Sequence, residues 1–103
     1  MNDQELAAAI VAHLGGDGPN NYAAYSIVID GIAHWMPAEK LVNDWRVAGA
    51  MLTKCHCLVL QNERSIWLAK VWATDESPRC EIADSASSPA RAINEACAEA
   101  HRS

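Results

Sequence analysis

Residues 55–73 read CHCLVLQNERSIWLAKVWA, and this stretch decides the fold. Two runs rich in strand-forming residues, 55–60 and 66–73, flank a polar connection, 61–65, whose length suits a hairpin. An antiparallel sheet with one face in water alternates apolar and polar residues along each strand. These two runs do not alternate in that way, because apolar residues occupy both faces of each strand. We therefore expect a sheet that needs helices to cover both of its faces.

A first helix is predicted over residues 2–14. Asn2 is a suitable N-cap and Glu5 follows three positions later, which is the pattern of a capping box. Gly15-Gly16 ends the helix, because glycine accepts the left-handed conformation that follows many helix ends. The residues expected on its buried face are Leu6, Ile10, His13 and Leu14, with Ala9 between them.

A second helix is predicted over residues 38–53. Pro37 suits its start, where the N–H that proline lacks is not needed. The apolar stripe expected to face the core comprises Leu41, Val42, Trp45, Ala48, Gly49 and Leu52. Glycine inside a helix costs about 1 kcal/mol relative to alanine. We therefore expect either very close packing at Gly49 or a helix that tolerates this loss.

Two further elements are predicted after the strand pair. Residues 79–84 form a third, shorter strand and complete an antiparallel meander. The last helix runs over residues 89–101, with Ser88 as its cap and Pro89 as its first residue. Its expected buried stripe consists of Ala92, Ile93, Ala96, Cys97 and Ala100. Side chains this small predict a close approach of the helix to the sheet.

The whole chain, residues 1–103, is predicted to form a single domain, since its length is that of a typical domain. Residues 25–29 allow two interpretations. They form either a short strand that ends at the turn dipeptide Asp30-Gly31 or an ordered loop that lies over the core. The fold class expected is α+β. We predict a three-layer α-β-α sandwich, in which a small antiparallel sheet of about three strands is covered by helices on both faces.

Three segments of the chain are similar to those of a known family. The first is Leu6-Ala7-Ala8-Ala9-Ile10-Val11 with its glycine stop, and the second is residues 44–51, where Trp45 is followed by Val47 and Met51. The third is residues 83–89, which lead into Ala92, Ile93 and Ala96. In these segments the chain resembles the phage ABA sandwich domain family. The resemblance implies a helix–sheet–helix sandwich encoded by a phage or prophage, and it implies no catalytic residues.

Charge and hydropathy argue against a nucleic-acid binder and against a membrane-spanning protein. The formal net charge is −5, which argues against a sequence-neutral nucleic-acid binder, since such proteins use Lys and Arg to neutralise phosphates. The N-terminus is acidic rather than basic, and the apolar stretch 6–14 is far shorter than the roughly twenty residues that span a bilayer. We expect a protein of the bacterial host cytoplasm that makes no membrane contact, with its four cysteines as thiols.

One group of residues offers metal or thiol chemistry. Cys55 and Cys57 share a face of the first strand, while Cys97 and His101 are four residues apart on the last helix. The four would meet if the helix lay over that strand face. Zinc sites, however, use C-x₂₋₄-C knuckles in pairs, and this spacing differs. We favour the interpretation that these cysteines are small apolar side chains, and we expect no metal, no cofactor and no catalytic residue.

Four carboxylates and one lysine in the strand region allow more than one interpretation. The carboxylates Asp75, Glu76, Glu81 and Asp84 lie around the third strand, where they favour a solvated sheet edge over acid–base catalysis. Lys70 lies between indoles in the second strand, which is the pattern of a base-stacking platform. We favour instead a lysine whose stem covers apolar surface while its amine reaches water. Nucleic-acid binding is therefore not expected.

Four tryptophans are many for a chain of this length. Trp45 is expected on the buried stripe of its helix and Trp72 on the sheet, whereas Trp35 and Trp67 are hard to bury together and are predicted to contact a partner. The function expected is that of a small phage- or prophage-encoded accessory protein. It is predicted to be a non-catalytic module that binds another protein or itself. The alternatives are a metal- or thiol-dependent site at Cys55, Cys57, Cys97 and His101, and nucleic-acid binding or mimicry.

Overall fold

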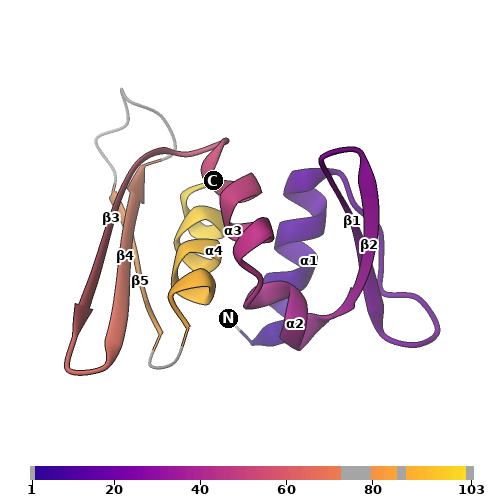
Figure 1. Ribbon diagram of the computed structural model, residues 1–103, viewed down its shortest axis with the longest axis horizontal. Coiled ribbons are helices and arrows are strands. Elements are labelled where there is room, and N and C mark those ends of the chain that lie inside the picture. Colours follow the sequence, from indigo (N-terminus) through magenta and orange to yellow (C-terminus); the bar gives the residue numbers. More distant parts are fainter. Residues whose placement is uncertain (1, 73–79, 86–87, 102–103) are drawn as a thin grey trace.

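The computed structural model describes residues 2–72, 80–85 and 88–101 and places four helices between two antiparallel sheets (Figure 1). The two-stranded sheet pairs β1 (Ala24–Ile29) with β2 (Ile32–Pro37). The three-stranded sheet has the order β3 (His56–Glu63), β4 (Ile66–Trp72) and β5 (Cys80–Ser85). The side chains of residues 56–59, 80–82 and 84–85 lie outside this description.

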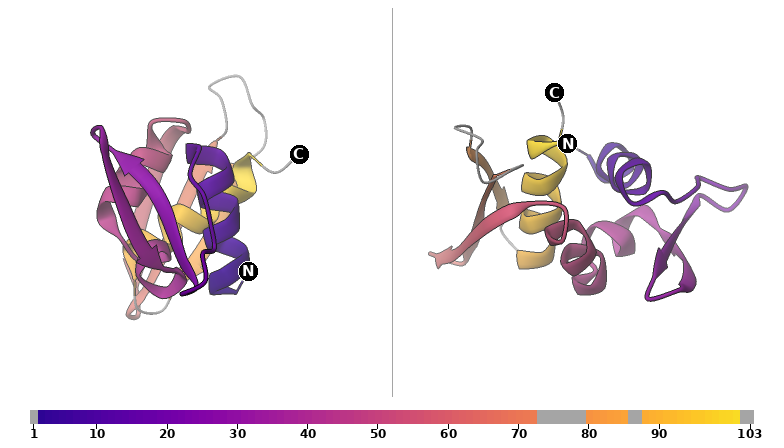
Figure 2. Two further views of the ribbon diagram at one scale, coloured as in Figure 1. Left: turned by 90° about the vertical axis from the view of Figure 1, so that its right-hand side faces the viewer. Right: turned by 90° about the horizontal axis from the view of Figure 1, so that it is seen from above.

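The α+β class is confirmed, but the three-layer α-β-α sandwich is not. The helices α1 (Asp3–Leu14), α2 (Ala38–Val42), α3 (Trp45–Leu52) and α4 (Pro89–Ala100) all lie on the inner side of each sheet (Figures 1 and 2). The reason is that residues 25–29, for which the sequence allowed a strand or a loop, form a strand and pair with a second strand that was not predicted. Because β1 and β2 form a second sheet, α1 and α2 pack against its inner face. Among the described elements, no helix then remains for the outer face of the three-stranded sheet.

The two long helices begin as predicted. The Asn2 Oδ1 accepts a hydrogen bond from the Glu5 N–H at 2.8 Å, and α1 ends at Gly15, whose φ is +76°. The Ser88 hydroxyl accepts from the Arg91 N–H at 3.1 Å, and Pro89 is the first residue of α4. These caps satisfy N–H groups that have no partner inside a helix.

The predicted helix over 38–53 is wrong as a single element, because it breaks at residues 43–44. Asp44 adopts an extended backbone and caps α3, with its Oδ1 2.7 Å from the Arg46 N and 3.3 Å from the Val47 N. The break rotates the apolar stripe. Trp45 is consequently 58% exposed, which corrects its expected place in the core. The residues of α3 that are buried instead are Val47, Ala48 and Met51.

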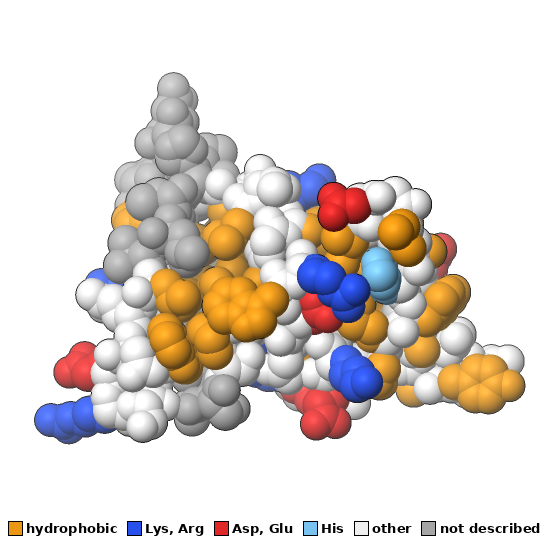
Figure 3. Space-filling view, viewed as in Figure 1, with side chains coloured by type: hydrophobic (Ala, Val, Ile, Leu, Met, Phe, Trp, Pro, Cys, Tyr) orange, Lys and Arg blue, Asp and Glu red, His pale blue; other side chains and the backbone are white. Residues whose placement is uncertain are grey.

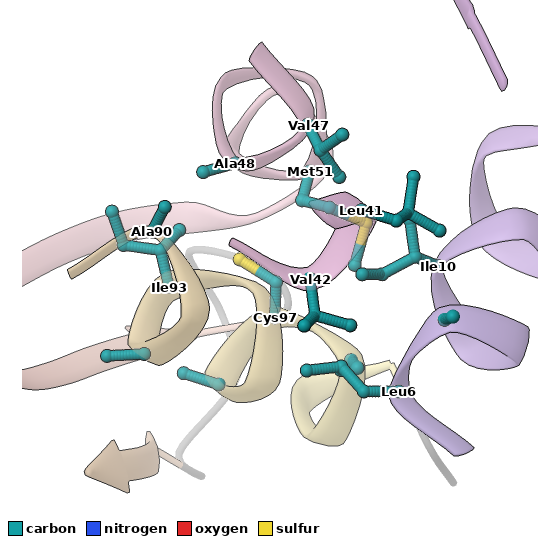
Figure 4. Close-up of a cluster of buried hydrophobic side chains, with 14 of the residues drawn as sticks. Leu6, Ile10, Leu41, Val42, Val47, Ala48, Met51, Ala90, Ile93 and Cys97 are labelled. Atoms are coloured by element: carbon teal, nitrogen blue, oxygen red, sulfur yellow. The ribbon is translucent and has the colours of Figure 1, made fainter. Parts of the chain in front are cut away.

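The core lies around α4, which packs against β4 and β5 on one side and against α1, α2 and α3 on the other. Its alanines permit this, because short side chains let several neighbours approach closely. Ala69, Val71 and Ala83 cover it from the sheet. Figure 4 shows side chains from all four helices directed toward one another on the opposite side. These are Leu6, Ile10, Leu41, Val42, Val47, Met51, Ile93 and Cys97, all nearly inaccessible to solvent.

Both hairpins turn through two residues with positive φ. Asp30 and Gly31, with φ of +53° and +79°, join β1 to β2, which confirms the turn that the sequence indicated. Arg64 and Ser65, with φ of +52° and +65°, join β3 to β4. The polar connection expected over 61–65 is thus shorter than predicted, because Gln61, Asn62 and Glu63 extend β3. Two positive values of φ are the signature of a type I′ turn, whose twist matches that of the strands.

Candidate functional site

The structure brings together three of the four residues named for metal or thiol chemistry. Cys55 lies just before β3, and Cys97 and His101 lie at the end of α4. The Cys55 Sγ is 3.5 Å from the His101 Nε2, and the Cys97 thiol donates a hydrogen bond to Cys55. The Cys57 side chain lies outside the described residues. These contacts require α4 to cover the β3 end, as the sequence analysis supposed.

A fourth residue, His13 of α1, joins this cluster and was not named as a site residue. Its ring stacks on that of His101, with centroids 4.2 Å apart. Among the described residues, its Nε2 is buried and has no hydrogen-bond partner. The helical stripe of α1 had indicated a buried face at position 13. The sequence carried no signal that α1 and α4 would place these two histidines together, because the two helices are far apart along the chain.

The contacts in the cluster shift the pKa values of the two thiols in opposite directions. The hydrogen bond from Cys97, together with the hydrogen bond and charge of His101, lowers the pKa of the Cys55 thiol to about 6 against the effect of burial. The same Cys97–Cys55 hydrogen bond, together with burial and the charge on Cys55, raises the pKa of Cys97. Cys55 is half-buried, whereas Cys97 is buried.

A cavity of about 560 Å³ opens beside the two imidazoles. Alanines of α1 and α4 form most of its wall, while His13, His101 and Glu5 are its polar groups. This volume is within the usual range for pockets that hold small molecules. In the described part of the chain, no group of three or more His, Cys, Asp or Glu side chains is arranged to hold a metal ion. The cluster therefore has the composition of a thiol–imidazole site.

The second candidate is the outer face of the β1–β2 sheet, which carries Trp35. The strands alternate, so that Tyr25, Ile27 and Met36 are buried against the helices while the opposite face lies in solvent. That outer face consists of Ala24, Ser26, Val28, Ala33, Trp35 and Pro37. Trp35 is 56% exposed at its centre, as was predicted for a partner contact. Residues 24–29 and 32–37 contain no Asp, Glu, Lys or Arg at all.

The two edges of this sheet differ. On the β1 edge, the Ser26 N–H and C=O bond with Asp17 at 2.7 and 3.0 Å, and the Ala24 C=O accepts from the Asn20 N–H at 2.9 Å. Because Ser26 uses its groups on that edge, its partner Trp35 turns its own N–H and C=O toward the β2 edge. Ala33 also turns its N–H and C=O toward the β2 edge, because it lies two residues from Trp35 and these groups alternate in direction along a strand. Within the described residues, Ala33 and Trp35 make no hydrogen bond on that edge.

The remaining residues considered from the sequence lie elsewhere. Trp67 is half-buried and packs against the core from β4, so its side chain has less free surface than Trp35. Lys70 is half-buried on the outer face of the three-stranded sheet, between Leu68 and Trp72 in the alternation of β4. Asp75 and Glu76, and the side chains of Glu81 and Asp84, lie outside the described residues.

Comparison with protein-family models, with curated proteins and with solved structures finds no match to this chain. The resemblance to the phage ABA sandwich domain family therefore stays a prediction. In the part of the chain that the structure describes, every helix is too short or too polar to cross a membrane.

Proposed function

We propose that this chain is a protein-interaction module that associates with a second copy of itself through the β1–β2 sheet. The observation that carries the proposal is the uncharged, apolar outer face around Trp35, which lies beside the open β2 edge. Four of the six large apolar side chains that are exposed among the described residues belong to this sheet or to the loop before it, which concentrates exposed apolar surface there. They are Tyr22, Val28, Ile32 and Trp35, of which Val28 and Trp35 lie on the outer face.

The open edge supplies the directional part of the contact. Ala33 and Trp35 point N–H and C=O groups outward, so an antiparallel strand placed against β2 finds donors and acceptors at the correct spacing. A second β2, related by a two-fold axis at His34, would pair Ala33 of one copy with Trp35 of the other. Such an interface uses the same patch on both copies.

The lack of charge on the two strands permits a second copy as the occupant. With a net charge of −5, two copies repel each other wherever acidic residues face one another. In a two-fold interface a charge near the axis lies close to its own copy, and the absence of charged residues from residues 24–29 and 32–37 removes this repulsion between the paired strands. Hydrophobic side chains also reach the surface at the hairpin end of the molecule in Figure 3, and charged side chains lie next to them, since Val28 and Asp30 line a hollow together with Arg46 of α3.

Sedimentation of the wild type and of Trp35→Ser tests the proposal. We expect a dimer in the wild type, and a monomer in the variant because the central apolar side chain is lost. Trp45→Ser is the matched control, since Trp45 is equally exposed but lies on α3. A wild type that stays monomeric up to about 1 mM, where an interaction worth about 4 kcal/mol populates a dimer, would contradict the proposal.

Ala33→Pro tests the contribution of the β2 edge to the interface separately from that of the outer face. Proline removes an N–H that points outward and leaves Trp35 in place, and edge positions tolerate proline. We expect this variant to fold, by circular dichroism, and to be monomeric. A dimer as stable as that of the wild type would show that the β2 edge is not part of the interface. The phage or prophage origin and the cytoplasmic location remain predictions beside this proposal.

A further inference from the structure

We propose that Cys55 and Cys97 form a dithiol site that reduces small hydroperoxides and closes a disulfide between the start of β3 and α4. The proposal rests on the contacts of the two thiols with each other and with His101, and on the cavity that His101 and His13 line. It does not depend on the hairpin interface.

The burial of the two sulfur atoms sets the order of events. Cys97 is inaccessible to solvent, whereas Cys55 is partly accessible at the junction between α3 and β3. An oxidant therefore reaches Cys55 first. The hydrogen bond between the thiols places Cys97 beside the sulfur that has been oxidised.

The imidazoles supply the polar surroundings of the reaction. His101 contacts the Cys55 sulfur at 3.5 Å and lines the cavity, while His13 stacks on its other side. His101 is thus the residue that joins the cavity to the Cys55 sulfur, since it lines the first and contacts the second. The alanine walls suit a small or apolar hydroperoxide, because among the described residues that line the cavity only Glu5 is acidic.

The chemistry balances without a metal or cofactor. The Cys55 thiolate attacks the terminal oxygen of R–O–OH, the O–O bond breaks, and Cys55 becomes a sulfenic acid while R–O⁻ takes a proton to leave as the alcohol. Cys97 then attacks the Cys55 sulfur, the S–O bond breaks, and hydroxide leaves as water with the proton of Cys97. Two thiols are oxidised to one disulfide, and one hydroperoxide is reduced to an alcohol and water.

The first step prepares the second. The Cys55 thiolate is the main cause of the raised pKa of Cys97, through their hydrogen bond and its charge. Conversion of Cys55 to the neutral sulfenic acid removes its negative charge, which is one of the causes that oppose ionisation of Cys97. Cys97 therefore becomes a better nucleophile only after Cys55 has reacted.

The test treats the reduced full-length chain with one equivalent of hydrogen peroxide and maps the cross-linked peptides. A Cys57→Ser, Cys80→Ser double variant keeps the proposed pair and removes the other two thiols. In both chains we expect a Cys55–Cys97 disulfide and a mass lower by two hydrogen atoms. A linkage to Cys57 or Cys80 in the wild type, or no linkage in the double variant, would overturn the proposal.

Two further variants test the assigned roles. Cys97→Ala stops after the first step, so Cys55 accumulates as a sulfenic acid that dimedone traps; an absence of trapped Cys55 would contradict its role as the attacking thiol. Alkylation of Cys55 should run about tenfold faster than that of an ordinary thiol at pH 6, because its larger thiolate fraction outweighs the weaker nucleophilicity of an acidic thiol. His101→Gln should move the midpoint of this pH profile upward, and an unchanged midpoint would exclude His101 as a positioning residue.

Discussion

At the scale of single residues, Asn94 holds the join between α2 and α4. It is inaccessible to solvent, and its Nδ2 donates to the Val42 C=O at 3.0 Å, where α2 ends. A carbonyl at a helix end has no partner inside the helix. The Asn94 amide therefore pairs with the Val42 carbonyl, which would otherwise be buried without a partner because the helix is interrupted at residues 43–44.

Asn94→Ala is expected to lower the free energy of unfolding by about 1–3 kcal/mol, the cost of leaving a buried acceptor unpaired. Urea unfolding measures this change. Asn43→Ala is the control, because the Asn43 Nδ2 donates to the Glu39 C=O at an exposed position. Water replaces that bond, so the control should change stability by less than about 0.5 kcal/mol. Equal effects of the two substitutions would contradict the role of Asn94.

His13 makes stability depend on pH. Burial lowers the pKa of His13, and the charges of His101 and Lys54 lower it further. In the unfolded chain the histidine has its ordinary pKa of about 6.5, so the unfolded state binds more protons than the folded state just below that pH. The free energy of unfolding should therefore fall as the pH decreases from about 7 toward 5.

His13→Gln should remove part of this dependence, because glutamine does not titrate. Urea unfolding at several pH values compares the two chains. The wild type should lose more stability on acidification than the variant. Parallel pH dependences would mean that His13 is not the group responsible.

At the scale of elements, Gly49 shows what the sequence alone leaves open. Two explanations were possible, close packing or a tolerated loss, and the second applies. A Cβ added at Gly49 would meet no atom within 4 Å, and the backbone there is helical. Gly49→Ala should therefore raise the free energy of unfolding by about 0.5–1 kcal/mol, measured by urea unfolding. A loss of stability would mean that another group occupies this space.

Local signals predicted most elements but not their arrangement. Caps and stops in the sequence marked α1 and α4, and strand-forming runs marked β3 and β4. The break before α3 was also readable, since Asn and Asp at 43 and 44 are capping residues, but the continuous apolar stripe concealed it. Residues around Asp30-Gly31 carried a strong hairpin signal, and the second sheet follows from it.

The candidate sites were predictable to different degrees. Cys55, Cys97 and His101 were grouped from their spacing, and the structure brings them together. His13 was missed because its contact with His101 depends on how α1 packs against α4. Trp35 was predicted to contact a partner, which stays a prediction, and the uncharged face around it required knowledge of β2, which the sequence did not indicate. Contacts between distant elements decide these features, and no local pattern encodes them.

At the scale of the whole molecule, the two sheets enclose the helices, so each sheet has one face outward. This arrangement explains why a chain rich in apolar residues keeps apolar side chains at its surface. On the three-stranded sheet, Ile66 is 45% exposed and Leu68 and Trp72 are half-buried. On the two-stranded sheet the outer face has no charge and adjoins an open edge. The hairpin is therefore the part of the molecule best suited to bind another chain.

Hydrogen exchange at the amides of Ala33 and Trp35, measured over a range of protein concentrations, tests this account most directly. Their N–H groups point to the open β2 edge, whereas those of His34 and Met36 point to β1. We predict rapid exchange at Ala33 and Trp35 in dilute protein and protection as the concentration rises, with His34 and Met36 protected throughout. Exchange at Ala33 and Trp35 that is independent of concentration, whether rapid or slow, would contradict the account.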